Sequence, residues 1–270
     1  MNNKIDISIV IPVYNASLTL KQAVQSVIDE CESCNLCYEI ILVNDGSTDN
    51  SLDVCLDCSA KNQYIKVLSQ KNAGPSAARN LGMSVANGEF IALNDSDDLW
   101  LPDKLNTQLE ELNNHPEIDL LCGKYGTSHN VGRKTIVTYN KEVFHNYFSP
   151  PTCIFRRQLT SCNNVKFPEN QKFSEDMRFF LDVLQYGRCV YLPKVVTSPV
   201  IKKHSFGDSG LSSHIWAMEK GELDNILYAY KINKISFITM LAAALWSFVK
   251  FIRRLFITSL IKIKKYRHTV

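Results

Sequence analysis

Two groups of acidic residues have the spacing of a metal-binding or catalytic site. Asp95, Asp97 and Asp98 fall within four residues, after a predicted strand at 90–94. Carboxylates in one site repel each other unless a cation lies between them, and divalent ions such as Mg²⁺ favour such oxygen ligands. We therefore expect a divalent metal that bridges this cluster to a diphosphate. The alternative is that Asp97 and Asp98 cap the next helix, and their position at a strand end favours the metal.

Glu175 and Asp176 form the second group, at the expected start of a helix near Ser174. Successive helical residues point in different directions, so only one of the two carboxylates can face a given ligand while the other caps or orients. The positive end of the helix dipole favours the ionised carboxylate, which is the form that a general base requires. An ordinary acidic first turn is the alternative.

Two further polar loops follow apolar runs. Asp45 and Gly46 come after the run 38–43, where they form either a tight turn or a place at which a carboxylate accepts a hydrogen bond from a base. Gly74 precedes a helix whose N-terminus favours an anion. Arg79 lies one turn into that helix, within reach of a phosphate or a base, unless it only belongs to a solvated helix face.

The elements that must position these residues alternate along the first hundred residues. Runs rich in β-branched residues predict strands at 7–13, 38–43, 65–69 and 90–94, with helical patterns between them. This alternation predicts an α/β fold with a mixed or parallel sheet flanked by helices. In open α/β sheets ligands bind at the carboxyl ends of the strands, which is where the polar loops lie.

Absent motifs exclude several enzyme classes. The chain contains no G-x-G-x-x-G, no G-x-x-x-x-G-K-[ST] and no G-x-S-x-G, which argues against a dinucleotide-binding dehydrogenase, a P-loop NTPase and an α/β-hydrolase. A nucleotidyltransferase would require a glycine-rich basic loop after the first strand, where this chain has Pro12-Val13-Tyr14-Asn15. That class is therefore a weak rival.

The cysteines and the chain start predict a protein of the cytoplasm. Nine cysteines are an odd number, and no basic region followed by a long apolar segment opens the sequence. Two groups of C-x-x-C spacing, over 31–37 and 55–58, raise the alternative of a zinc or iron–sulfur site. Cys31 and Cys55 fall on the predicted buried faces of two helices, which favours small buried thiols.

The end of the chain is basic and apolar. Residues 225–270 carry nine Lys or Arg and no Asp or Glu, and 235–249 are uncharged. Lys250, Arg253 and Arg254 share one face of a predicted helix. We expect residues 235–270 to lie on an anionic membrane surface as an amphipathic tail, because the apolar run is shorter than the about 20 residues of a span. Packing on the body or a homodimer interface is the alternative, and no nucleic-acid partner is expected.

Taken in order, the motifs resemble those of the family-2 glycosyltransferases, which have a GT-A-type fold. The resemblance is strong over residues 5–105, and weaker through Phe167-Pro168-Glu169 and Glu175-Asp176 to His204. The motifs that carry it are Ser8 to Asn15, Asp45 to Asp49, Asn72 with Gly74, Ala78 to Asn80, and Asp95 to Asp98. The family often has a second acidic residue where this chain has Asn44, so a role that needs this charge is not carried over.

The resemblance implies an inverting transfer of a sugar from a UDP-sugar to an acceptor hydroxyl. Asp176 would be the catalytic base, and Asp97 would ligate Mn²⁺ or Mg²⁺ with Asp98 nearby. The residues implied to bind the nucleotide sugar are Pro12, Val13 and Tyr14 at the uracil, Asp45 at the uracil N–H, Gly74 and Arg79 near the base and diphosphate, Asp95 and Ser96 at the ribose or sugar, and His204 in a basic segment over the diphosphate.

The resulting hypothesis has three parts. Residues 1–105 are expected to be the nucleotide-sugar-binding half, 106–210 the acceptor-binding half, and 211–270 a helical membrane-associating tail. The expected activity is transfer of a hexose, such as glucose or galactose, to a glycan on a lipid diphosphate, in polysaccharide or O-antigen assembly at the cytoplasmic face of the inner membrane. A non-catalytic protein that binds sugar nucleotides or scaffolds a membrane is the alternative.

Overall fold

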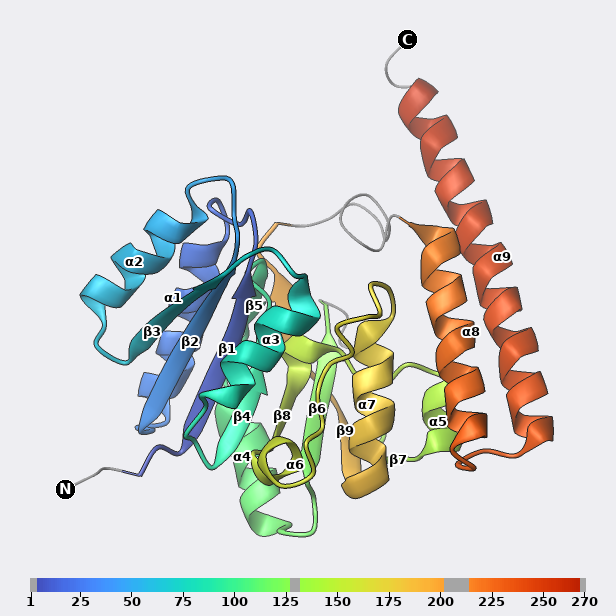
Figure 1. Ribbon diagram of the computed structural model, residues 1–270, viewed down its shortest axis with the longest axis horizontal. Coiled ribbons are helices and arrows are strands. Elements are labelled where there is room, and N and C mark those ends of the chain that lie inside the picture. Colours follow the sequence, from blue (N-terminus) through green and yellow to red (C-terminus); the bar gives the residue numbers. More distant parts are fainter. Residues whose placement is uncertain (1–3, 127–131, 202–213, 268–270) are drawn as a thin grey trace.

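One mixed sheet runs through the molecule, with strand order β3-β2-β1-β4-β8-β6-β9-β5 and β7 paired with β9 (Figure 1). The computed structural model describes residues 4–126, 132–201 and 214–267. The strands are β1 (Ile7–Val13), β2 (Tyr38–Asp45), β3 (Ile65–Gln70), β4 (Phe90–Leu93), β5 (Asp98–Trp100), β6 (Leu120–Tyr125), β7 (Thr135–Val137), β8 (Cys153–Arg156) and β9 (Cys189–Pro199). The first four strands are parallel neighbours, and β8 continues the sheet antiparallel to β4. The α/β prediction is confirmed.

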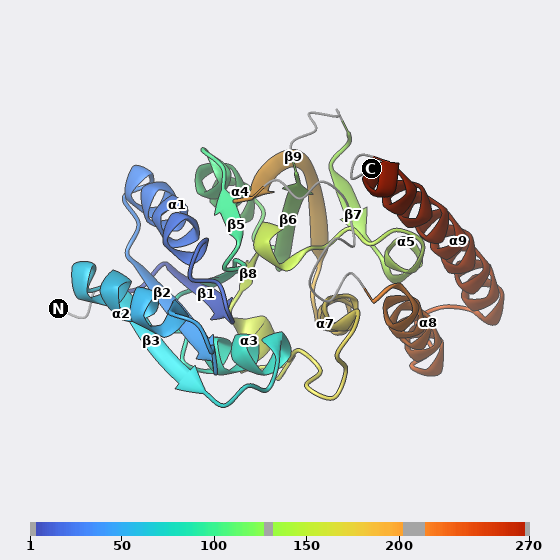
Figure 2. The same ribbon diagram turned by 90° about the horizontal axis from the view of Figure 1, so that it is seen from above.

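Helices cover both faces of this sheet (Figure 2). They are α1 (Leu20–Ser33), α2 (Ser51–Lys61), α3 (Pro75–Ser84), α4 (Lys104–Asn114), α5 (Tyr139–Phe144), α6 (Gln158–Ser161), α7 (Glu175–Tyr186), α8 (Ile215–Lys231) and α9 (Phe237–Arg267), with a short 3-10 helix at Pro150–Thr152. Alternate strand residues point to opposite faces. Ile9 and Ile11 therefore enter the core shared with α1 and α4, whereas Val10 enters the core shared with α3 and α7.

The alternative that Asp97 and Asp98 cap a helix is excluded, because Asp98–Trp100 forms β5 antiparallel to β9 and the next helix begins at Lys104. On α2, Leu56 is 52% exposed. Cys55 and Cys58 are buried on that helix instead, so its packed face is rotated away from Leu56.

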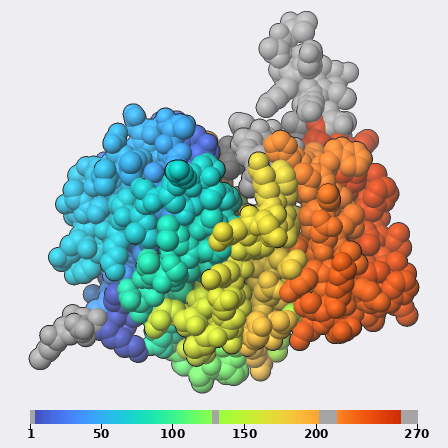
Figure 3. Space-filling model, in the orientation of Figure 1, coloured from blue at the N-terminus to red at the C-terminus, as the bar shows by residue number. Residues whose placement is uncertain are grey.

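α8 and α9 pack side by side against α7 and α5 and form one flank of the molecule (Figure 3). The cationic face predicted for the tail is wrong in part, because two of its three cations turn inward. Lys250 and Arg254 point to α8, where they pair with acidic residues, and Phe251 is buried. Among the residues described, no helix has the length and apolar composition to cross a membrane.

Candidate functional site

A cavity of about 610 Å³ lies at the carboxyl ends of β1, β2 and β4. It brings together every donor-site residue that the sequence predicted within the described ranges, while His204 lies outside them. Asp176 does not line it. The lining residues are Pro12, Val13, Tyr14, Asp45, Asn72, Gly74, Pro75, Arg79, Asp95, Ser96, Asp97, Lys172 and Glu175.

The loop after β1 presents Tyr14 to the cavity with half of its side chain exposed. The next residue, Asn15, adopts a left-handed conformation with φ of 49°. Its backbone N–H donates to Ser47 Oγ at 3.2 Å, and its side-chain oxygen accepts from the Thr48 N–H at 2.8 Å. The loops after β1 and β2 are therefore held together, and the Tyr14 ring is available to stack on a flat ligand.

Asp45, at the end of β2, organises the neighbouring loop. Its carboxylate accepts from the backbone N–H groups of Ala73 and Gly74, each at 2.8 Å, and from Gln70 Nε2 at 2.8 Å. A carboxylate offers about four acceptor positions, so one remains for a ligand N–H. Gly46 has φ of 65°, and an added Cβ would lie 2.7 Å from the Asn72 backbone N, so this close approach requires glycine.

Arg79 is buried at the base of the cavity. Its Nη2 donates to Asp95 Oδ1 at 2.8 Å, and its Nη1 lies 3.8 Å from Glu175 Oε1. Burial opposes the charge, but the facing carboxylates of Asp95 and Glu175 raise the pKa of Arg79 above its usual value. Nη1 and Nε have no hydrogen-bond partner. Arg79 also lines the cavity, and a guanidinium there suits an anionic ligand such as a phosphate.

The first turn of α7 separates the two acidic neighbours. Ser174 adopts a left-handed conformation with φ of 55°, and Glu175 then lines the cavity beside Arg79. Burial and the neighbouring carboxylate of Asp176 raise the pKa of Glu175 to about 7. Asp176 accepts from the Met177 N–H at 2.8 Å, and burial raises its pKa too. Only Glu175 faces the donor cavity, a choice that the sequence left open.

A set of backbone and side-chain contacts fixes the acidic turn after β4. The Asp98 N–H donates to Asp95 O, and the Val200 N–H donates to Asp97 O at 2.8 Å. The Tyr125 hydroxyl donates to Asp98 Oδ1 at 2.5 Å, so this turn is held from β6 and β9. Burial, together with Asp98, raises the pKa of Tyr125 above its usual range. Sequence reasoning missed Tyr125, because no spacing rule links it to Asp98.

The donor atoms of this turn fit a divalent cation that also binds a diphosphate. Mg²⁺ and Mn²⁺ sites often use one or two protein carboxylates and take further oxygens from phosphates. Asp97 and Asp95 both line the cavity, and Asp95 is also paired with Arg79. Within the described ranges, no three His, Cys, Asp or Glu side chains are grouped as a complete protein-only metal site.

The cysteines have the character of packed thiols. Cys31, Cys55 and Cys58 are buried, as the sequence predicted for the first two, whereas Cys37 is exposed. Burial raises the pKa of Cys55 to about 12, so this thiol is protonated at neutral pH. A protonated buried thiol is a poor metal ligand.

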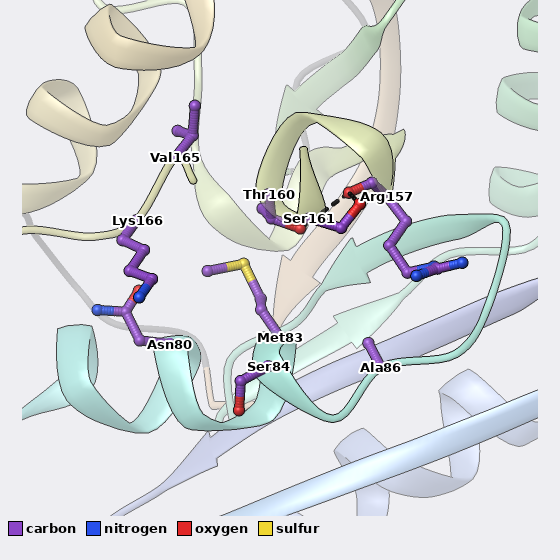
Figure 4. A pocket seen from close by; sticks show the side chains of 9 residues that line it. All are labelled: Asn80, Met83, Ser84, Ala86, Arg157, Thr160, Ser161, Val165 and Lys166. Carbon is purple, nitrogen blue, oxygen red and sulfur yellow. Dashed lines mark hydrogen bonds between the residues drawn. The ribbon is translucent and has the colours of Figure 1, made fainter. Parts of the chain in front are cut away.

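A smaller cavity of about 190 Å³ lies between α3 and α6, away from the strand ends (Figure 4). None of the predicted site residues lines it. Arg157 and Lys166 lie at opposite ends of the cavity in this view and do not converge on one point. Arg157 also donates through Nε to the Gly88 carbonyl at 2.7 Å. The lining of this smaller cavity therefore lacks the convergent polar groups of the first cavity.

The chain is similar in sequence to several known glycosyltransferases and to a protein of teichoic acid biosynthesis. An uncharacterized glycosyltransferase of Haemophilus influenzae is 33% identical over 221 residues, 78% of this chain and 85% of that protein. The minor teichoic acid biosynthesis protein GgaA of Bacillus subtilis is 33% identical over 192 residues, 66% of this chain and 43% of that protein. Other relatives are also longer, and the chain spans 26% of a Rickettsia bellii glycosyltransferase.

Solved structures show the same fold. The crystal structure of S. aureus TarS 1–349 in complex with UDP-GlcNAc superposes with a TM-score of 0.66 at 22% identity. The match covers 89% of this chain and 70% of the TarS chain. Residues 8–174 match the family described as Glycosyl transferase family 2. Since this match spans more than half of the 270 residues, the chain belongs to glycosyl transferase family 2, with its GT-A-type fold.

Proposed function

We propose that the protein is a metal-dependent inverting glycosyltransferase that transfers a hexose from a UDP-sugar to a hydroxyl of a glycan acceptor. One observation carries this proposal: a single cavity joins the exposed Tyr14 ring, the Arg79 guanidinium and the carboxylate of Asp97. These groups suit a base, a phosphate and a cation respectively. The UDP-GlcNAc bound by TarS supports a UDP-linked donor.

Each residue has a task in the proposed reaction. Tyr14 stacks on the uracil, Asp45 accepts its N–H, and Arg79 binds the diphosphate. Asp97 would hold Mg²⁺ or Mn²⁺, and the ion would neutralise the charge that grows on the departing diphosphate. Ser96, which lies between Asp95 and Asp97 and also lines the cavity, contacts the sugar.

The attacking hydroxyl loses its proton to Asp176 as the bond from the anomeric carbon to the acceptor oxygen forms. The bond to the diphosphate oxygen breaks on the opposite face, which inverts the configuration. A raised pKa makes Asp176 a stronger base than an exposed carboxylate. Glu175, in the donor cavity, orients Arg79.

We also place the enzyme in surface polysaccharide assembly on the cytoplasmic face of a membrane, with an acceptor carried on a lipid diphosphate. The role of GgaA in minor teichoic acid biosynthesis supports a polymer product. The apolar and basic α9 supports an acceptor held at a membrane. The sugar, whether glucose, galactose or another hexose, is to be found by a screen of UDP-sugars.

The donor site is tested by calorimetric titration of UDP, then GDP, with and without Mn²⁺. We expect UDP binding that requires Mn²⁺ and that Asp97→Asn abolishes. Asp53→Asn is the matched control, since Asp53 is an exposed carboxylate on α2 away from the cavity. Absence of binding by either nucleotide would overturn the donor assignment, and UDP binding without turnover on any UDP-sugar would favour a non-catalytic binding protein.

The base is tested by comparing Asp176→Asn with Glu175→Gln. Asp176→Asn should lower turnover by about 10²- to 10⁴-fold and leave UDP affinity unchanged. Glu175→Gln should instead weaken UDP binding, because it removes a carboxylate that faces Arg79. A normal turnover rate in Asp176→Asn would transfer the role of base to Glu175.

A further inference from the structure

The side of α9 that points away from α8 is a continuous apolar surface. Its residues recur every three or four positions and are between 47% and 79% exposed: Ile238, Leu241, Leu245, Val249, Ile252 and Phe256. We call these six residues the α9 stripe. At 1.5 Å per residue the stripe is about 27 Å long. α9 forms the outer edge of the molecule in both ribbon views (Figures 1 and 2). An exposed apolar surface of this length indicates a partner.

The rotation of α9 about its axis is fixed by contacts on its opposite side. Ala243, Ser247 and Phe251 are buried against the body. The Phe251 ring meets the Trp216 ring of α8 edge-on at 4.6 Å, and Ser247 Oγ donates to Glu219 Oε1 at 2.9 Å. Since α8 and α5 occupy this side of α9, the six stripe residues are left exposed.

Acidic residues of α8 draw cations to the inner side of α9. Lys250 pairs with Glu222 at 2.5 Å, and Arg254 pairs with Glu222 at 2.9 Å and with Glu219 at 3.2 Å. Although burial opposes it, the facing cations lower the pKa of Glu222. These pairs keep two charges off the outer surface, and Arg253 remains exposed beside the stripe.

The charge pattern distinguishes between two occupants of the stripe, a lipid surface and a second copy of the chain. Residues 225–270 contain nine Lys or Arg and no Asp or Glu, with four of these cations at 262–267. In a two-fold pairing of two stripes, the facing segment 225–270 of the second copy would offer these cations no Asp or Glu. Anionic lipid headgroups supply that negative charge. We propose that the α9 stripe docks on an anionic membrane, with α9 lying in the interface.

Docking through the stripe would also set the position of the donor cavity relative to the membrane. α8 is hydrogen-bonded to Ser174, the residue before Glu175. Ser174 Oγ donates to Met218 O at 3.1 Å, and Asn225 Nδ2 donates to Ser174 O at 2.8 Å. The start of α7 is thus held at a fixed distance from α9. Presentation of a lipid-linked acceptor to this site rests on the proposed function, whereas docking itself does not.

The test is co-sedimentation of the full chain with vesicles of phosphatidylcholine alone or mixed with phosphatidylglycerol. We expect strong binding to the anionic vesicles and weaker binding to the neutral ones. The double variant Leu245→Glu/Ile252→Glu should lower binding to both by more than about tenfold, since each position loses the burial of a large aliphatic side chain. Leu56→Glu is the matched control, because Leu56 is 52% exposed on the distant α2.

Light scattering in lipid-free buffer and UDP titration complete the design. Failure of the natural chain to bind vesicles would overturn the docking proposal. This holds whether the chain is a monomer or a dimer that Leu245→Glu/Ile252→Glu dissociates. Equal loss of vesicle binding in Leu56→Glu would do the same. UDP binding should be unchanged in the double variant. Vesicle binding by a chain that does not bind UDP would leave the docking surface in place and refute the proposed function alone.

Discussion

At the scale of single residues, the donor cavity depends on one buried cation. Arg79 is 6% exposed and compensates two carboxylates, Asp95 and Glu175, that come from different elements. Its guanidinium also lies 5.1 Å from the centre of the Phe167 ring. Removing one member of a buried ion pair leaves the other charge uncompensated, which costs more than the pair contributes.

Arg79→Met should therefore destabilise the protein by about 3 to 5 kcal/mol, because the buried carboxylate of Glu175 and the partly buried carboxylate of Asp95 lose their counter-charge. It should also abolish UDP binding under the proposed function. The measurement is urea denaturation followed by fluorescence. Arg188→Met is the control at an exposed arginine, with an expected change within about 0.5 kcal/mol. Equal effects in the two variants would show that Arg79 carries no special charge compensation.

At the scale of elements, α8 acts as a support for the start of α7. Asn225 is fully buried and bonds the Ser174 carbonyl, and Gln171 Nε2 reaches both that carbonyl and Asn225 Oδ1. Gly221 lies against the Phe173 carbonyl, where an added Cβ would approach the oxygen to 2.4 Å. This close contact brings α8 against the left-handed residue that turns Glu175 toward the cavity.

Gly221→Ala separates this support from helix propensity. In an ordinary helix the change would stabilise the protein by about 1 kcal/mol. Here the added methyl group contacts backbone, and we expect a loss of about 1 to 3 kcal/mol together with weaker UDP binding. Thermal unfolding and UDP titration measure both. A gain in stability would show that α8 and the segment before α7 separate without cost.

At the scale of the whole molecule, a polar group is buried where α4 meets the sheet. Lys104 is fully buried and donates to Gln108 Oε1 at 2.7 Å, and Gln108 Nε2 donates to Thr152 O at 2.9 Å. Burial lowers the pKa of Lys104 to about 7. In the unfolded chain a lysine has a pKa of about 10.4, so between these values the unfolded chain binds more protons.

The free energy of unfolding should therefore rise with pH over this window. Relative to Lys104→Met, which cannot titrate, the natural chain should gain about 2 kcal/mol between pH 7 and pH 9. Urea denaturation of both proteins at the two pH values gives this difference and cancels the contribution of the cysteines. Parallel stability changes in the two proteins would show that Lys104 keeps an ordinary pKa in the fold.

The sequence by itself determined the first four strands and the loops that follow them. Strands buried on both faces need continuous apolar runs, and polar residues after such runs must meet at one edge of a parallel sheet. The prediction of an α/β fold, and of the residues from Pro12 to Asp97 that line one cavity, depends on these local rules. The tail was likewise predicted as helical, and α8 and α9 bear this out.

Only the tertiary structure decided which way individual side chains point. Glu175, not Asp176, enters the donor cavity because Ser174 is held in a left-handed conformation by α8. Lys250 and Arg254 turn inward because acidic residues of α8 face them. Contacts between residues distant in the sequence set these directions, and no periodicity or spacing along the chain encodes them.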